Sequence, residues 1–568
     1  MCGIAGIINS DFNKKDMLCN MLKALDHRGP DAQLVWNDDN IVLGHNRLAI
    51  IDLNEASNQP MVSTCNRYVI VFNGEIYNYI ELKKLLPDYQ FKTQSDTEVL
   101  LALFIEKGEN CLDLINGMFS FAIWDIKDRI LFAARDRFGV KPFYYTIHEN
   151  SFYFASEPKA LFNAGIPKIH SQEVWAKYFM SGSYGLPNET FFENIKQLPA
   201  SHCLTIGNKS NSLKIKKYYN FIERIKQNTF YKNNKFEEEY IDLMHSSISF
   251  RLRADVPIGI NVSGGLDSSS LLILSNKLNK KTAENFHAFT FYSDNPDYDE
   301  LPWVEEIVKK TKNKLSSVLI TPNETPELAL KVANYMEEPY GGLPTLAYSK
   351  IFKQARENNI IVLLDGQGID EAWAGYDYYK NLDMNSIIQG TKGNPFRADV
   401  LIPEIRIKAK NNNYPQPFNN TLQNMQYRDL FYTKIPRALR FNDRISMMYS
   451  TELREPFLDY RLVEMAFSLP DNLKLNDNEG KWLLRKLVKS KLGENIAFAP
   501  KRALQTPQRE WLQDDLKFWV EDRIKSLSLH PWFDKKVIRE LWDDYKKGSN
   551  DNSFYLWQLI NFSMCTDV

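Results

Sequence analysis

The strongest constraint on the fold is a change in the pattern of hydrophobic residues between about residues 207 and 236. Before it, short apolar or alternating runs such as CGIAGII, YVIVFNGEIYNY and ILFAARD are broken by Gly, Asn and Asp. Such runs predict a strand-rich domain with a few helices. After it, apolar runs such as VPIGINV and IIVLL alternate with helical segments, which is typical of a parallel sheet covered on both faces. Two architectures therefore follow one another in one chain.

The predicted boundaries follow this change of pattern. We expect a first domain over residues 1–206 and a linker or surface excursion, rich in Lys, Asn and Gln, over residues 207–236. The second domain is expected over residues 237–568, and its part beyond about Pro395 has helical periodicity with almost no strand signal. A chain of 568 residues is too long for a single hydrophobic core, which agrees with this division.

Charge and composition exclude several classes of protein. Lys+Arg 70 against Asp+Glu 71 gives a net charge of -1, so there is no global basic field for nucleic acid. No run approaches the roughly 18 to 20 apolar residues needed to cross a bilayer. The six cysteines show no CxxC spacing and the N-terminus has no signal-peptide pattern. We expect a cytoplasmic protein without membrane or nucleic-acid partners; the sequence does not set its oligomeric state, and a homodimer is compatible with it.

Cys2 is the first candidate catalytic residue. Removal of Met1 would leave Cys2 with a nucleophilic thiol and a free amine on the same carbon. The thiolate is the reactive form, and an α-amine with a pKa of roughly 7.7 to 8.0 is a usable base at neutral pH. The alternative is that Cys2 is a small buried hydrophobic residue at the start of a strand.

The stretch SGGLDSSS, which begins at Ser263, is the second candidate site. It follows a predicted buried strand and opens a predicted helix, a context in which backbone N–H groups can face phosphate oxygens. It lacks the GK[ST] ending of a Walker A loop. The alternative is a simple Gly-Gly turn with serine caps.

The first domain resembles the class II glutamine amidotransferases. The motifs that carry the resemblance are HRGPD (27–31), GHNRLAIID, FNGEIYNY, SDTEV and RDRFGVKPFYY (135–145), which follow the family's order. The resemblance implies an N-terminal-nucleophile hydrolase (Ntn-hydrolase) fold, an αββα sandwich. It also implies roles for Cys2 as the nucleophile, for Asn73 and Gly74 as the oxyanion hole, and for Arg47, Glu75 and Asp96 in binding glutamine, with Arg47 on its carboxylate and Asp96 on its ammonium. Taken alone, Arg47 could form a surface ion pair and Asn73-Gly74 a hairpin turn.

The second domain is similar to the asparagine synthetase family. SGGLDSS resembles the pyrophosphate loop of enzymes that split ATP between its α and β phosphates, and YDE, DRISMM, ELREPFLDYRLVEMAFSLP and GKWLLRK continue the match. The resemblance implies a parallel α/β ATP-pyrophosphatase sheet with Mg²⁺ on Asp267 and Asp370. In APKRALQTP, Lys501 falls where that family has a lysine beside the reacting phosphoryl group, so the resemblance implies a catalytic role for Lys501. The implied ATP-binding residues are Ser263, Gly264, Gly265, Asp267, Ser268, Asp365, Gly366 and Asp370.

Together the two resemblances imply ATP- and glutamine-dependent formation of an amide. One domain would release ammonia from glutamine and the other would convert a carboxylate into an acyl-adenylate. Ammonia would pass between them through a dry interior passage. The products would be the amide, glutamate, AMP and pyrophosphate, and the leading acceptor is aspartate.

Two departures from the family pattern concern the acceptor. DGQGIDE carries Gln367 where the family has a glutamate, and an amide cannot act as a base near neutral pH. That role could pass to Asp365, to Glu371 or to the substrate. The stretch EEPYGGLPTLAYSK (337–350) also departs from the usual pattern around the acceptor. Another carboxylate, such as a sugar acid, a cell-wall precursor or a secondary metabolite, is therefore the alternative.

Other classes of function explain less of the sequence. A stand-alone glutaminase leaves SGGLDSS without a role. An ATP-pyrophosphatase that acts on RNA does not fit the neutral charge balance or the attached glutaminase motifs. A non-catalytic sensor would tolerate loss of Cys2 or Lys501, and both are present.

Overall fold

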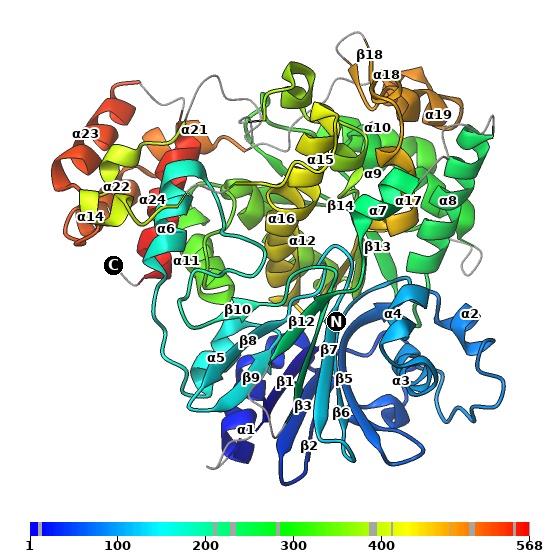
Figure 1. The fold of residues 1–568 in the computed structure, drawn as a ribbon. Coiled ribbons are helices and arrows are strands. Elements are labelled where there is room, and N and C mark those ends of the chain that lie inside the picture. The colour runs from blue at the N-terminus through cyan, green and yellow to red at the C-terminus, as the bar shows by residue number, and fades with distance from the viewer. Residues whose placement is uncertain are drawn as a thin grey trace.

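The computed structural model describes residues 1–8, 14–207, 213–227, 235–279, 285–384, 395–410, 413–476, 479–498, 506–548 and 552–566. In Figure 1 the N-terminal strands, blue to cyan, form one half of the molecule, and the segments from green to red form the other. The predicted fold class, with an αββα sandwich followed by a parallel α/β sheet and a mostly helical C-terminal part, is confirmed.

Two antiparallel six-stranded sheets form the first domain, with strand orders β10-β8-β9-β1-β3-β2 and β12-β11-β7-β6-β5-β4. The strands of the first sheet are β1 (Gly3–Ile8), β2 (Ala32–Asn37), β3 (Ile41–Arg47), β8 (Tyr144–His148), β9 (Ser151–Ala155) and β10 (Lys196–Gln197). Those of the second are β4 (Met61–Val62), β5 (Tyr68–Ile76), β6 (Gly117–Asp125), β7 (Ile130–Arg135), β11 (His202–Gly207) and β12 (Lys214–Lys217).

Three hydrophobic clusters hold these layers together. Between the sheets, side chains from β1, β3, β5 and β6 meet, among them Ile4, Leu43, Val71 and Trp124. Helices α1 (Lys14–Ala24) and α5 (Pro158–Asn163) cover the outer face of the first sheet. Helix α3 (Asp96–Lys107) covers the outer face of the second sheet. Alternate residues of each strand therefore face different apolar layers, which explains the near-continuous apolar runs in the sequence.

The segment that the sequence analysis treats as a linker contributes regular structure. Its strand β12 extends the second sheet by pairing with β11, and it is followed by helix α7 (Phe221–Gln227). Tyr219, between them, donates a 2.7 Å hydrogen bond to Glu464 of the second half. The exposed lysines of KIKK account for the polar composition, because β12 is an edge strand with its side chains in solvent.

A five-stranded parallel sheet, in the order β15-β14-β13-β16-β17, lies at the centre of the second half. Its strands are β13 (Ile258–Asn261), β14 (His287–Ser293), β15 (Leu315–Ile320), β16 (Val362–Leu364) and β17 (Glu452–Arg454). In β16, Val362 and Leu364 join one hydrophobic cluster and Leu363 joins the other. Both faces of the sheet are thus buried, as expected from its apolar strands.

Helices cover both faces of this sheet. Those whose apolar residues join the cluster of Val362 are α8 (Phe236–Arg251), α9 (Leu266–Leu278), α10 (Leu301–Thr311) and α17 (Tyr460–Phe467). Those on the side of Leu363 are α11 (Thr325–Met336), α12 (Leu343–Glu357) and α24 (Ser553–Cys565).

The C-terminal part is mostly helical, as predicted. Its helices include α15 (Thr421–Phe431), α16 (Lys434–Met447), which carries most of DRISMM, and α19 (Trp482–Leu492), which carries most of GKWLLRK. Later helices include α21 (Gln508–Gln513), α22 (Lys517–Leu527) and α23 (Lys535–Lys546). Among the described residues, no helix combines the length and apolarity that a membrane span requires.

Candidate active sites and family membership

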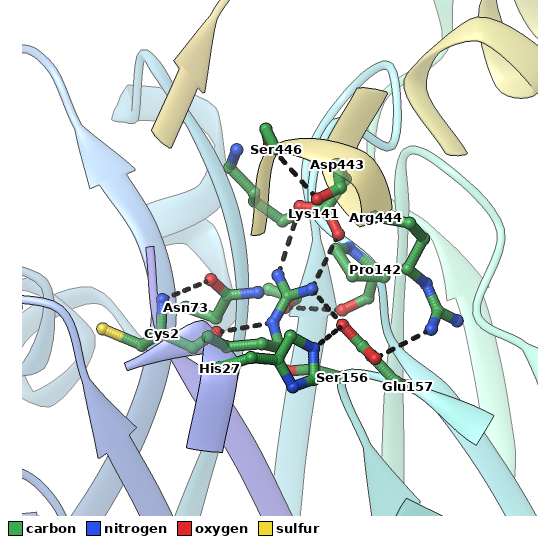
Figure 2. Close-up of polar contacts among 12 residues, drawn as sticks. Cys2, His27, Asn73, Lys141, Pro142, Ser156, Glu157, Asp443, Arg444 and Ser446 are labelled. Atoms are coloured by element: carbon green, nitrogen blue, oxygen red, sulfur yellow. Dashed lines mark hydrogen bonds and ion pairs between the residues drawn. The ribbon is translucent and has the colours of Figure 1, made fainter. Parts of the chain in front are cut away.

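The first site lies where β1 of one sheet meets β5 of the other. Cys2, directly before β1, donates its backbone N–H to Asn73 Oδ1 at 3.0 Å, across 71 positions of sequence. Figure 2 shows the two residues side by side. The Cys2 side chain is 8% exposed, and burial raises the pKa of its thiol. The fold therefore places Asn73, which the resemblance assigns to the oxyanion hole, in direct contact with Cys2.

Asn73 and Gly74 lie within strand β5, so the interpretation as a hairpin turn is wrong. Asn73 Nδ2 is buried and has no hydrogen-bond partner among the described residues, although its amide oxygen is held by Cys2. Gly74 has a φ of 154° and no room for a side chain, since a Cβ would lie 2.1 Å from Met118 O.

The backbone N–H of Gly74 faces an edge of β5 that is free of strand pairing. The N–H groups of Phe72 and Ile76, two residues either side, donate to Gln59 Oε1 and Asp96 Oδ2 at that edge. Because N–H groups alternate in direction along a strand, the N–H of Gly74 points the same way. Asn73 and Gly74 thus supply two donors near Cys2, which is the composition of an oxyanion hole.

The residues expected to bind glutamine surround this point. Arg47, at the end of β3, is 6% exposed, and its guanidinium contacts Asn54 O and Asn58 Oδ1, each at 2.8 Å. It is therefore held by the loop that follows β3, and it forms no ion pair with any residue that the structure describes. Asp96, at the start of α3, is buried, and burial raises its pKa to about 6. Glu75 is buried and faces Arg454 of β17, with a 3.4 Å contact.

Arg28, in the HRGPD motif, was not singled out from the sequence. Its Nε donates to Cys2 O at 3.0 Å, and its Nη1 donates to Glu157 Oε1 at 2.6 Å. The same Nη1 donates to Asp443 Oδ2 of α16 at 2.9 Å. Cys2 is thus tied to the second domain through Arg28. The HRGPD motif drew attention to this segment, but the partner of Arg28, Asp443, is distant in the sequence.

The second site lies at the carboxyl end of β13, where strand, glycine turn and helix α9 follow as predicted. Gly264 has a φ of 68°. Ser268 Oγ accepts from Ser263 N at 3.1 Å, so the turn closes on the first turn of the helix. A cavity of about 640 Å³ opens beside this turn. The expected ATP-binding residues that line it are Ser263, Gly265, Asp267, Ser268, Asp365, Gly366 and Asp370.

Asp267 and Asp370 meet at one cation, the ammonium of Lys481. Lys481 Nζ lies 2.6 Å from Asp267 Oδ2 and 2.6 Å from Asp370 Oδ1. Burial alone would lower the pKa of Lys481, but the two carboxylates raise it. Two carboxylate oxygens that converge on one cation also suit Mg²⁺, which takes a few carboxylates together with phosphate oxygens. Lys481 comes from the GKWLLRK motif, to which the sequence analysis gave no role.

Gln367 and Asp365 both line the cavity beside the glycine turn. Glu371 is fully buried and accepts a 2.6 Å hydrogen bond from Tyr376 Oη, and burial raises its pKa to about 7. Of the two carboxylates considered as substitutes, Asp365 is the one in the cavity wall. Lys501 lies outside the described residues.

Each half of the chain matches a known protein family. Residues 1–219 match the glutamine amidotransferase domain and residues 239–567 match the asparagine synthase family. Glutamine-hydrolysing asparagine synthetase 3 of Bacillus subtilis (strain 168) is 30% identical, over 99% of this chain and 96% of that protein. Asparagine synthetase 1 of the same organism is 28% identical with the same coverage. Amidase chry2 of Gibberella zeae is 25% identical over 90% of each chain. The chain therefore belongs to the asparagine synthase family and carries an N-terminal glutamine amidotransferase domain.

Proposed function

We propose that the protein transfers the amide nitrogen of glutamine to a carboxylate through an acyl-adenylate made from ATP. Aspartate is the leading acceptor, which would make the protein a glutamine-hydrolysing asparagine synthase. One observation carries the proposal: both sites are present in one chain. Cys2 contacts Asn73 in the first domain. In the second, a glycine turn lines a cavity in which Asp267 and Asp370 converge.

The proposed glutaminase step begins with removal of Met1. The nitrogen of Cys2, already held by Asn73 Oδ1, then becomes a free amine that takes the thiol proton. The sulfur attacks the amide carbon of glutamine, and Asn73 Nδ2 and the N–H of Gly74 donate to the developing oxyanion. The amine of Cys2 returns the proton to the leaving nitrogen, which departs as ammonia. Water then cleaves the thioester to give glutamate.

The proposed synthetase step uses the cavity beside α9. The acceptor carboxylate attacks the α-phosphorus of ATP, pyrophosphate leaves, and an acyl-adenylate results. Backbone N–H groups of the turn at Ser263–Gly265 face the phosphates at the helix N-terminus, and Lys481 offsets their negative charge. Asp267 and Asp370 would hold Mg²⁺, which neutralises phosphate charge when bound. Ammonia attacks the acyl carbon, AMP leaves, and Asp365 is positioned in the cavity wall to receive the surplus proton.

The acceptor remains open to test because Gln367 differs from the family pattern. Amidase chry2 is a relative whose name does not mention asparagine, and this supports keeping other carboxylates as the second candidate. The test is release of AMP and pyrophosphate with glutamine, ATP and Mg²⁺ across a panel of acids. Stimulation by aspartate, with ¹⁵N passing from amide-labelled glutamine into asparagine, is the expected result. No stimulation by aspartate, together with stimulation by another acid, would replace aspartate as the acceptor.

A further inference from the structure

Helix α16 carries three cations that no carboxylate holds at hydrogen-bond distance in the described part of the chain. They are Lys434, Arg437 and Arg440, which we call the α16 cations. At a spacing of three residues, neighbouring members of this set lie next to each other on the helix surface. Arg444, further along α16, differs from them, because it pairs with Glu157 at 3.0 Å.

Lys434 is a buried ammonium without an oxygen partner. The residue is 8% exposed, and its Nζ lies 4.9 and 5.2 Å from the ring centroids of Tyr376 and Tyr378. The ring faces stabilise a positive charge, but they leave its three N–H donors without an acceptor oxygen. Asp429 and Glu371 are the carboxylates that raise its pKa. Neither forms an ion pair with it, and each is bonded to a tyrosine hydroxyl at 2.6 Å.

Arg437 brings a second positive charge close to Lys434. Burial, together with this charge, lowers the pKa of Lys434 to about 7, so the two cations repel each other. The guanidinium of Arg437 lies over the ring of Tyr184 of the first domain, 6.0 Å from its centroid. Among the described residues, Arg437 has no acidic partner that would offset the repulsion.

Arg440 adds a third cation to the series. Its side chain is 9% exposed, and its Nε and Nη1 have no hydrogen-bond partner among the residues that the structure describes. Its two polar contacts are long, 3.6 Å from Nη1 to Glu338 Oε2 and 3.5 Å from Nη2 to Gln197 Oε1. Unfilled donors on buried charged groups cost stability. The α16 cations, two of them buried, therefore lack the anion that such groups normally contact.

Helix α16 also contacts two parts of the chain that line the ATP cavity. Tyr376, beneath Lys434, directly follows Gly375, and Gly375 lines the cavity. Helix α12, which packs against α16, contributes Tyr348 to the cavity wall. An anion held by the α16 cations would therefore lie beside the place where the proposed function needs the acceptor.

We propose that Lys434, Arg437 and Arg440 bind a second anionic group of the acceptor, a carboxylate or a phosphate that is not itself amidated. The inference rests on the proposed function, and it defines the substrate class as acids with at least two anionic groups. One such group has enough oxygens to accept from Lys434 and Arg437 together, and its charge would offset their repulsion. An acid whose only anion becomes the amide would leave the α16 cations unfilled.

Matched acids that differ by one anionic group test this site. One pair is aspartate and β-alanine, which lacks the α-carboxylate, and the other is glucuronic acid 1-phosphate and glucuronic acid. Calorimetry measures their binding to the full chain with Mg²⁺ and α,β-methylene-ATP, so that no turnover is needed. In one pair we expect the acid with the second anion to bind about 10- to 100-fold more tightly, the effect of a charge-assisted hydrogen bond. The pair that shows this difference identifies the group as carboxylate or phosphate.

Four variants relate the difference to the α16 cations. Arg437→Gln should abolish it by weakening only the acid with the second anion, and Arg437→Lys should retain part of it. Lys434→Met should also abolish it without lowering the melting temperature, because it replaces an unpaired buried ammonium by an apolar group of similar length. Lys353→Gln, which removes an exposed ammonium of α12 paired with Glu357, is the control and should keep the full difference.

Two results would overturn the site. One is the absence of such a difference in both pairs of acids, and the other is a wild-type difference in Arg437→Gln. Failure of the proposed function has a separate signature. The acids would then bind with the expected difference, but no AMP would form from ATP and ammonium chloride with any of them.

Discussion

Arg28 Nη1 lies 2.9 Å from Asp443 Oδ2, although the two residues are 415 positions apart in the sequence. The same guanidinium donates from Nε to the backbone oxygen of Cys2 at 3.0 Å. Arg28 is fully buried and Asp443 is 5% exposed. A carboxylate of the second domain therefore orients the peptide group of the proposed nucleophile, which gives a physical link between the two halves.

Asp443→Ala should destabilise the protein by about 3 kcal/mol, because it leaves a buried guanidinium with fewer partners. Glu157 still holds Arg28, so the protein should fold, and urea denaturation can measure the change. Asp399→Ala is the control. It breaks the exposed Arg397–Asp399 ion pair and should cost no more than about 1 kcal/mol. Equal losses in the two variants would contradict a structural role for the Arg28–Asp443 pair.

Cys2→Ala should abolish release of glutamate and leave ammonium-dependent formation of AMP intact, because the thiol serves only the first site. Asn73→Ala removes one donor from the oxyanion and should lower kcat for glutamine hydrolysis by roughly 10²- to 10³-fold. A glutamate assay and an AMP assay on the same preparations measure both effects. Glutaminase activity that persists in Cys2→Ala would rule out Cys2 as the nucleophile.

Structural elements that depend on neighbouring residues could be predicted from the sequence. Contacts between residues that are distant in the sequence could not. Alternating apolar runs predicted a strand-rich first domain, the family resemblance implied the sandwich, and SGGLDSS predicted the strand, turn and helix at Ser263 because all three are local. The contact of Lys481 with Asp267 joins residues 214 positions apart, and no spacing rule indicates it. The ion pair between Met1 and Glu452 depends in the same way on the packing of one domain against the other.

At Asn73-Gly74 the local sequence pattern favoured a structure that the fold does not adopt. Read locally, Asn-Gly favours a turn. Within β5, glycine is instead required at position 74 because its φ is positive and because β6 passes too close for a Cβ. Pairing with β6 along the whole of β5 overrides the local preference. Only the family resemblance, which assigned these residues to the oxyanion hole, indicated a role other than a turn.

Lys481→Ala should remove most ATP-dependent release of pyrophosphate and leave glutamine hydrolysis unchanged. The substitution removes the ammonium that lies between Asp267 and Asp370, so the positive charge proposed to offset the phosphates would be lost. Lys489→Ala, on the same helix α19, removes a half-exposed ammonium paired with Glu494 and serves as the control. Pyrophosphate release and glutamate release are measured for both variants. Wild-type release of pyrophosphate by Lys481→Ala would show that Lys481 does not act on the phosphates of ATP.

Asp96 should make glutamine binding sensitive to acid. Burial raises its pKa to about 6 in the free protein, and only the carboxylate attracts the ammonium of glutamine. We expect kcat/KM for glutamine hydrolysis to fall as the pH drops below about 6, since this ratio reports the free enzyme. Asp96→Asn should have a low kcat/KM without this inflection. A wild-type inflection near the ordinary pKa of Asp would indicate that Asp96 is more solvated than the fold implies.

Glu455 should lower stability at alkaline pH. Its pKa is about 8 in the folded protein against 4.5 ordinarily, with burial as the main cause. A raised folded pKa means that the native state binds the proton more tightly, so its contribution to stability is complete below 4.5 and is lost as the pH rises through 8. Glu455→Leu lacks this proton, so its stability relative to wild type should rise from pH 5 to pH 8.5, by about 2 to 4 kcal/mol. Urea denaturation at the two pH values measures the change, and Glu404→Leu, at an exposed position, should show no such dependence. If the difference between Glu455→Leu and wild type were the same at both pH values, the carboxyl would be ionised throughout, and the charges of Lys141 and Arg251, which lower its pKa, would outweigh its burial.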